Sequence, residues 1–126
     1  AVMRCIHFYQ ENARVPRQVA ALQAGDFDEF LRLIGQSGRS SWMYLQNISA
    51  PGSSKDQAIA TALALSESLL QENGAYRVHG GGFAGTIQAF VPQKDTESYI
   101  ALMESVFGEG CCYVLSIREC GGTEIC

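Results

Sequence analysis

The stretch that decides the fold is residues 77–86, which read Arg77-Val78-His79-Gly80-Gly81-Gly82-Phe83-Ala84-Gly85-Thr86. It holds four of the chain's 13 glycines. An ordered glycine is about 0.5–1 kcal/mol less favourable than alanine because it loses more backbone entropy. So many glycines in one place therefore need a physical reason. They could form a hairpin loop whose residues need positive φ, or a bare backbone that a phosphate or another chain approaches closely.

Both flanks of this glycine loop (residues 80–85) have the alternation of a β-strand. Residues 75–79 alternate between two faces, residues 86–91 do the same, and Pro92 ends the second run because it lacks an amide donor. On the first strand the two faces carry Tyr76 with Val78 and Arg77 with His79. The sequence therefore predicts two antiparallel strands joined by the glycine loop.

This context argues against three nucleotide-binding motifs. Gly80, Gly82 and Gly85 fit G-x-G-x-x-G, but the dinucleotide fingerprint needs a helix directly after the glycines, and a strand is expected there. A protein-kinase loop needs H-R-D and D-F-G motifs downstream, and neither follows. The Walker pattern G-x-x-x-x-G-K-[ST] is absent from the chain.

Composition bounds the class of protein. The 126 residues suit one domain, residues 1–126, and 47% hydrophobic against 17% charged residues predicts a real core and a surface poor in charge. With a net charge of −4 and no basic cluster, binding to nucleic acid or to an anionic membrane is not expected. No apolar run approaches the roughly 20 residues of a membrane span, and no signal peptide is recognisable. A cytoplasmic protein is expected.

The cysteines favour neither a disulfide framework nor a zinc site. They are odd in number, include an adjacent pair and form no C-x-x-C: Cys5, Cys111, Cys112, Cys120 and Cys126. We expect reduced thiols. No metal site is predicted elsewhere either.

In the first 41 residues, the pattern predicts helices followed by a loop. Residues 2–22 have helical spacing, with either a kink or a new helix at Pro16. Gly25 is a stop signal, Asp26 starts the next helix, and residues 36–41 read as a loop. His7, Glu11 and Arg14 are three to four residues apart on one face of the first helix, which indicates a structural polar stripe.

The remaining elements are read from caps and periodicity. Residues 42–51 form a short strand or an ordered loop that ends in turn residues. Ser54 and Gln57 make a capping box for a helix that Gly74 closes, with Ala58, Ala62, Leu65 and Leu69 on its packed face. A further helix starts at Asp95 or Thr96 and ends at Gly108, with Tyr99, Leu102, Met103, Val106 and Phe107 inward. Cys112 to Ile117 is predicted as a third strand, followed by a frayed tail around Gly121-Gly122.

Residues 77–86 resemble the third motif of the GHMP small-molecule kinases, which in galactokinases reads Arg-Met-Thr-Gly-Gly-Gly-Phe-Gly-Gly-Cys. Its departures from that form include His79, Ala84 and Thr86. A looser likeness extends upstream, with Gly38 standing where many members have His. The similar upstream positions are His7, Glu11, Arg14, Val15, Gly25, Asp26, Phe30 and Ser37.

The resemblance implies an α+β fold like a GHMP C-terminal domain. That fold is a split β-α-β, ferredoxin-like arrangement, a small antiparallel sheet with helices packed on one face. It also implies a protein that continues upstream, since Ala1 leads directly into what reads as mid-helix sequence. The family's phosphate loop and its catalytic Asp and Arg belong to an N-terminal domain, and none of them is in this chain.

The implied activity is that of a galactokinase, the phosphorylation of galactose to galactose 1-phosphate with ATP and Mg²⁺. The loop residues carried over as one wall of the active cleft are Gly80, Gly81, Gly82, Phe83 and Gly85. His79, Trp42, Tyr44 and Asn47 are weaker candidates, for which packing or an orienting hydrogen bond is the plainer role. The implied partners are the N-terminal domain, galactose and ATP. The chain alone is expected to be inactive and to self-associate weakly through its bare face.

A different class of function fits the same residues. A free-standing ferredoxin-like module could bind a small ligand, or a partner strand at the edge of its sheet, without catalysis. An upstream segment that carries the phosphate loop would decide for the kinase.

Overall fold

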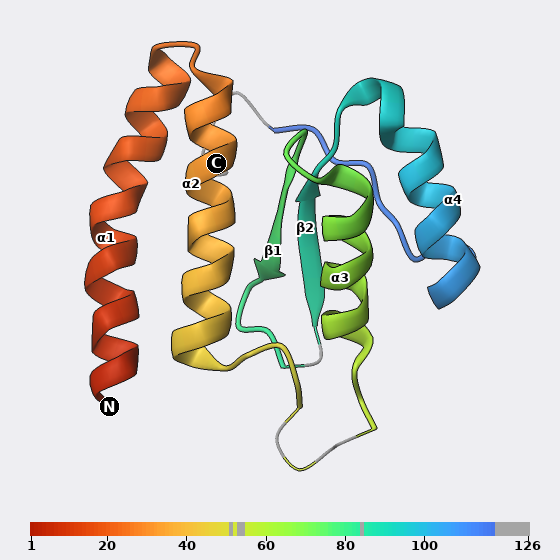
Figure 1. The fold of residues 1–126 in the computed structure, drawn as a ribbon, viewed down its shortest axis with the longest axis horizontal. Coiled ribbons are helices and arrows are strands. Elements are labelled where there is room, and N and C mark those ends of the chain that lie inside the picture. Colours follow the sequence, from red (N-terminus) through yellow and green to blue (C-terminus); the bar gives the residue numbers. More distant parts are fainter. Residues whose placement is uncertain (51, 53–54, 84, 118–126) are drawn as a thin grey trace, which may run out of the picture.

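The computed structural model describes residues 1–50, 52, 55–83 and 85–117, and within them the fold is α+β. Four helices surround a two-stranded antiparallel sheet (Figure 1). The elements are α1 (Val2–Gln23), α2 (Phe27–Ser40), a π-helical turn η1 (Ser41–Leu45), α3 (Ala58–Leu70), β1 (Ala75–His79), β2 (Thr86–Phe90), a 3₁₀ turn η2 (Gln93–Asp95) and α4 (Thr96–Phe107).

The predicted hairpin is confirmed. β1 and β2 are antiparallel, and their register runs from Ala75 opposite Phe90 to His79 opposite Thr86. β2 ends at Phe90, one residue before the predicted end. No helix starts at the glycine loop, so the dinucleotide reading of its glycines has no support in this fold.

Helices cover both faces of this sheet, so the prediction that they pack on one face is wrong. Ala75 belongs to a buried cluster with Phe30 of α2, whereas its neighbour Tyr76 packs against a cluster that contains Leu70 of α3. Neighbouring residues of a strand point to opposite faces, so the two clusters lie on opposite sides. In Figure 1 the strands accordingly lie between the pair α1 and α2 and the pair α3 and α4.

The start of the chain follows its local signals. α1 is one helix with Pro16 inside it, so no second helix begins there. At its end Gly25 has φ +69°, and the amides of Gly25 and Asp26 donate to the carbonyls of Leu22 and Ala21 in a Schellman arrangement. Asp26 then caps α2 by accepting a hydrogen bond from the Glu29 amide (3.0 Å).

The predicted loop over residues 36–41 is wrong, because α2 continues to Ser40 and passes into η1. Gly38, which read as a loop residue, lies where α2 approaches β1. A Cβ there would be 2.9 Å from the Cβ of Arg77 and 3.0 Å from the Tyr76 carbonyl oxygen. The glycine permits close packing of helix on strand, a contact that local propensity does not encode. The possible strand within residues 42–51 is likewise replaced by η1 and turns.

α3 packs with a face one residue away from the predicted one. It buries Ile59, Ser66 and Leu70, whereas Leu69 is exposed. The polar Ser66 is buried because its hydroxyl bonds the Tyr99 hydroxyl of α4 (2.7 Å) and the Ala62 carbonyl (2.7 Å). α3 ends at Leu70, before the predicted stop at Gly74, and Ser54 of the predicted capping box lies outside the described residues.

α4 is confirmed, whereas the third strand is wrong. α4 spans Thr96–Phe107 with Gly108 as its C-cap, although Val106 is exposed rather than inward. Residues 111–117 pair with no strand in the described part of the chain. Period-2 alternation is present there, but no neighbouring strand accepts its backbone hydrogen bonds. Cys112 alone of this segment packs against the α3–α4 cluster, and the predicted tail at Gly121-Gly122 lies outside the described residues.

No helix among the described residues is long and apolar enough to cross a membrane.

Candidate functional site

The glycine loop turns through left-handed backbone conformations. Gly80 and Gly82 have φ of +65° and +82°, and Phe83 has φ +67°, a region that a side chain with a Cβ rarely adopts. Gly81 does not share this conformation, and a Cβ placed on it would meet nothing within 4 Å. Turn geometry therefore explains Gly80 and Gly82. Gly81 leaves open space beside the backbone.

Asn47 fastens this loop to the rest of the molecule. Its carbonyl accepts a hydrogen bond from the Phe83 amide (2.7 Å), and its side-chain Nδ2 donates to the Gly81 carbonyl (3.3 Å) and to the Ser41 hydroxyl (2.9 Å). A Cβ on Gly82 would lie 2.3 Å from the Asn47 carbonyl oxygen. Asn47 is only 1% exposed. It therefore positions the loop from beneath and does not face a ligand.

Trp42 and Phe83, which are far apart in sequence, meet at one hollow. It has a volume of about 520 Å³ and lies between the start of α1, η1 and the loop, with Arg4 and Gln46 also on its wall. Both aromatic rings are about half exposed. Gln46 is a second non-glycine residue with positive φ, +55°, and it follows directly on the π-helical turn.

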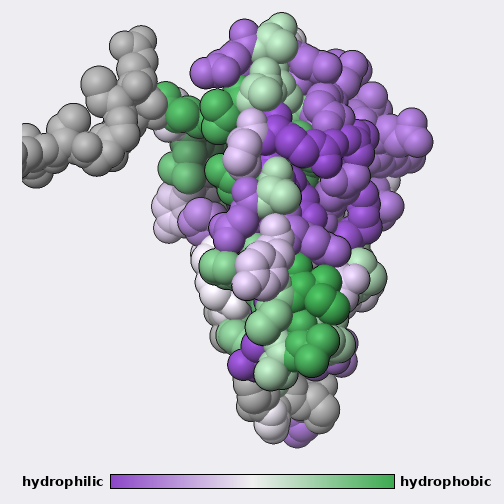
Figure 2. All heavy atoms as spheres, turned by 90° about the vertical axis from the view of Figure 1, so that its left-hand side faces the viewer, coloured by the Kyte–Doolittle hydropathy of each residue, from purple (hydrophilic) through white to green (hydrophobic). Residues whose placement is uncertain are grey.

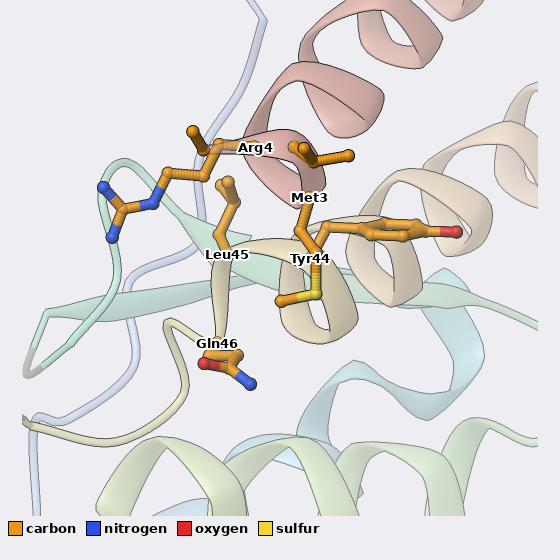
Figure 3. Close-up of a pocket in the computed structure, with 7 residues that line it drawn as sticks. Met3, Arg4, Tyr44, Leu45 and Gln46 are labelled. Atoms are coloured by element: carbon orange, nitrogen blue, oxygen red, sulfur yellow. The ribbon is translucent and has the colours of Figure 1, made fainter.

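Tyr44 lines a neighbouring hollow of about 590 Å³ at the start of α1. The two hollows share Arg4, Leu45 and Gln46. In Figure 3 the Arg4 side chain and the Tyr44 ring extend in opposite directions. Arg4 has no carboxylate within ion-pair distance among the residues that the structure describes. A guanidinium beside open space and aromatic rings can hold an anionic or planar ligand.

His79 does not line either hollow. It is the last residue of β1, pairs with Thr86 in the ladder and is exposed. In residues 1–50, 52, 55–83 and 85–117, no hydrogen-bond partner of its ring is found. The orienting hydrogen bond expected of His79 is thus not seen.

The polar stripe of α1 is structural, as predicted, and its partners are on α2. His7 Nδ1 bonds the Ser40 hydroxyl (3.0 Å), and Glu11 accepts a hydrogen bond from the Ser37 hydroxyl and pairs with Arg14.

Sequence reasoning missed that Arg77 of β1 joins this network. Its guanidinium donates to Ser37 (2.6 Å) and lies 3.5 Å from the Glu11 carboxylate. The sequence pattern of β1 could have indicated this contact, because it places Arg77 on the strand face opposite Tyr76 and Val78. A buried face that carries an arginine needs an acid nearby.

The described residues offer no evident metal or thiol chemistry. No three His, Cys, Asp or Glu side chains gather in the described ranges in a way that could hold a metal ion. Cys5, Cys111 and Cys112 are free thiols, and burial raises the pKa of Cys112 to about 11, so that thiol is a poor nucleophile near neutral pH. Cys120 and Cys126 lie outside the described residues.

Among the described residues, the walls of the two hollows carry no Asp, Glu, His or Cys side chain. The amides of Gly81 and Gly82 meet no backbone acceptor among the described residues. They are the groups with which a glycine loop binds an anion. The sequence matches no known family model, and no solved structure matches the chain.

Proposed function

We propose that this chain is the C-terminal domain of a galactokinase of the GHMP small-molecule kinase superfamily. In this proposal the glycine loop forms one wall of the active cleft, against an N-terminal domain that carries the phosphate loop and the catalytic residues. The protein acts in the cytoplasm on galactose, with ATP and Mg²⁺.

The observation that carries this proposal is the open backbone at Gly81. The loop is anchored by Asn47 on one side, yet no atom of residues 1–50, 52, 55–83 or 85–117 lies within 4 Å of a Cβ on Gly81. A glycine that neither turn geometry nor internal packing requires is explained by the close approach of something outside the chain. The motif resemblance identifies that partner as the phosphate and sugar of a kinase reaction.

Phosphoryl transfer suits such a wall. The γ-phosphoryl group of ATP passes to a galactose hydroxyl, ADP leaves, and the reaction depends mainly on positioning and on stabilising the charge of the phosphoryl oxygens. Backbone amides fixed by the Asn47 contacts supply positive dipoles without reorganisation. Trp42 and Phe83, at the adjoining hollow, give the cleft an apolar border.

The first test compares this chain with the longer protein that we propose contains it. Both are assayed with galactose and Mg²⁺-ATP under the same conditions. We expect galactose 1-phosphate from the longer protein and none from the chain alone. Sugar phosphate formed by the chain alone would overturn the two-domain proposal, and none from the longer protein would overturn the galactokinase proposal.

The second test is Gly81→Val in the longer protein. Its Cβ meets no atom and its φ is ordinary, so the variant should fold with an unchanged melting temperature. Turnover should fall at least tenfold, which corresponds to about 1.4 kcal/mol of lost transition-state stabilisation. The matched control is Gly35→Ala in α2, where a Cβ makes only an ordinary contact 3.6 Å from Arg39. Unchanged turnover in Gly81→Val would leave the glycine as a turn residue alone.

The alternative, a binding module without catalysis, has one observation in its favour. The sheet has two strands in the described part of the chain, so its edges are available to a partner strand. Such a module would bind an extended peptide in the absence of any upstream domain. The same assay separates the two functions, since a binding module has no kinase activity at any length.

A further inference from the structure

The outward face of α1 carries apolar side chains that nothing in the described chain covers. Phe8, Val15, Val19 and Leu22 are 59%, 49%, 48% and 44% exposed. The inward face contacts α2 through the polar network of His7 and Glu11 and through the buried Ala21. Figure 2 views the molecule from the α1 side and shows hydrophobic surface among the hydrophilic, most of it toward the end at which α1 begins. α1 thus exposes to solvent an apolar face of the kind that is normally buried in a core.

The spacing of this face indicates what covers it. Cys5, Phe8, Asn12, Val15, Val19 and Leu22, here called the α1 seam, are separated alternately by three and four residues. This is the a/d pattern of a heptad repeat, with a mean period of 3.5 residues, and another α-helix is the surface that fits it. Val2 and Tyr9, both strongly exposed, widen the seam at neighbouring e positions.

Charge favours a second copy of the chain as the other helix. The chain has a net charge of −4, so two copies carry like net charge and repel each other at long range. α1, however, carries a single acidic residue, Glu11, and that carboxylate is turned inward to Ser37 and Arg77. The seam is therefore a place at which two acidic molecules can meet without carboxylates in contact.

Asn12 fixes the direction of the second helix. It is the polar residue of the seam and lies at an a position between Phe8 and Val15. In a parallel, in-register pair, a faces a, so Asn12 meets Asn12 and the two amides bond each other. In an antiparallel pair a faces d, so Asn12 would meet Val15 and its amide would lose its hydrogen bonds on burial.

From these observations we infer that the chain forms a homodimer through a parallel, in-register pairing of α1 with α1. α1 is already ordered by its contacts with α2, so association does not bear the cost of forming a helix. Phe8, Val15, Val19 and Leu22 become buried against their counterparts, and the two copies of Cys5 lie side by side. This inference stands apart from the proposed kinase activity, because it rests on the α1 seam and not on the glycine loop.

The first test is the oligomeric state of the chain by sedimentation velocity. The double variant Val15→Lys/Val19→Lys places two positive charges in the seam and should raise the dimer dissociation constant at least tenfold. The matched control is Val106→Lys on α4, an exposed valine (49%) outside the seam, and it should leave the dissociation constant unchanged. A monomeric wild-type chain, or equal weakening by the α4 control, would overturn the proposal.

The second test reads the direction of pairing. Cys111, Cys112, Cys120 and Cys126 are replaced by serine, which leaves Cys5 as the sole thiol, and the chain is treated with oxidised glutathione. Two Cys5 thiols then give up two protons and two electrons to the glutathione disulfide, and the chain becomes a covalent dimer. A parallel seam brings the two Cα atoms within the roughly 4.4–6.8 Å that a disulfide spans. A dimer that Val15→Lys/Val19→Lys dissociates but that Cys5 does not cross-link would overturn the parallel arrangement.

Discussion

Tyr76 shows how one residue couples an element to its neighbour. It lies on β1, on the face that packs against the α3–α4 cluster, and its hydroxyl donates a hydrogen bond to the Glu67 carboxylate of α3. Burial, and secondly this hydrogen bond, raise the pKa of Tyr76 to about 12. Both causes favour the neutral phenol in the folded chain.

At the scale of this residue we predict alkaline destabilisation. Because the pKa of Tyr76 is raised from 10 to about 12 on folding, its contribution to stability is fully present below pH 10 and is lost between pH 10 and pH 12. The free energy of unfolding in urea should therefore fall more steeply over this range in the wild type than in Tyr76→Phe. Tyrosinate absorbance should show one phenol fewer with a pKa near 12 in the variant. Parallel pH profiles for the two proteins would show that Tyr76 titrates normally.

At the scale of the element, the hairpin is held by the close approach of Gly82 to Asn47. Gly80 and Gly82 both have positive φ, but a Cβ on Gly80 meets nothing, whereas a Cβ on Gly82 meets the Asn47 carbonyl oxygen at 2.3 Å. Substitutions at Gly80 and Gly82 therefore distinguish the cost of backbone strain, which both share, from the cost of a steric clash, which only Gly82 has.

We predict that Gly82→Ala is clearly more destabilising than Gly80→Ala. Each alanine must adopt a left-handed backbone conformation, which lowers the free energy of unfolding by roughly 1–2 kcal/mol. Gly82→Ala must also displace the Asn47 backbone, which adds about 1–3 kcal/mol. Urea unfolding monitored by the fluorescence of Trp42, near this contact, measures both variants. Equal losses would mean that the turn from η1 to Asn47 shifts without cost.

At the scale of the whole molecule, Glu11 joins three elements. Its carboxylate on α1 accepts from Ser37 of α2 and lies beside Arg77 of β1 as well as its own neighbour Arg14. Arg14 is buried, and Glu11 and Arg77 are largely so. Removing the charge leaves two guanidinium groups in one partly buried site with no acid.

We predict that Glu11→Gln lowers the free energy of unfolding by roughly 2 kcal/mol, since a buried charge loses its partner while the Ser37 contact can persist. Glu29→Gln is the matched control, because Glu29 also joins two arginines, Arg17 and Arg32, but at the exposed surface. Its loss should be much smaller, as is usual for exposed pairs. Chemical denaturation at neutral pH compares the two, and similar losses would show that the Glu11 network contributes no more than a surface pair.

The sequence by itself determined the parts of this protein that depend on neighbouring residues. The glycine loop and its strands, the stop at Gly25, the cap at Asp26 and the extent of α4 were all predictable, because φ preferences, caps and period-2 alternation act over a few residues. The structural role of the polar stripe of α1 was also predictable from the sequence. The loop residues of the candidate site could be named, but not what holds them.

Only the tertiary structure decided the parts that depend on distant residues. α2 continues through Gly38 because β1 packs closely against it at this glycine. Asn47 holds the glycine loop because its side chain binds the Gly81 carbonyl, more than thirty residues away in the sequence. Residues 111–117 alternate like a strand yet pair with no strand among the residues that the structure describes, and a strand exists only where a neighbour accepts its hydrogen bonds. Helices lie on both faces of the sheet, and Arg77 of β1 contacts Glu11 of α1 and Ser37 of α2 on one of them. α1 meets α2 through the polar contacts of His7 and Glu11 and through the buried Ala21.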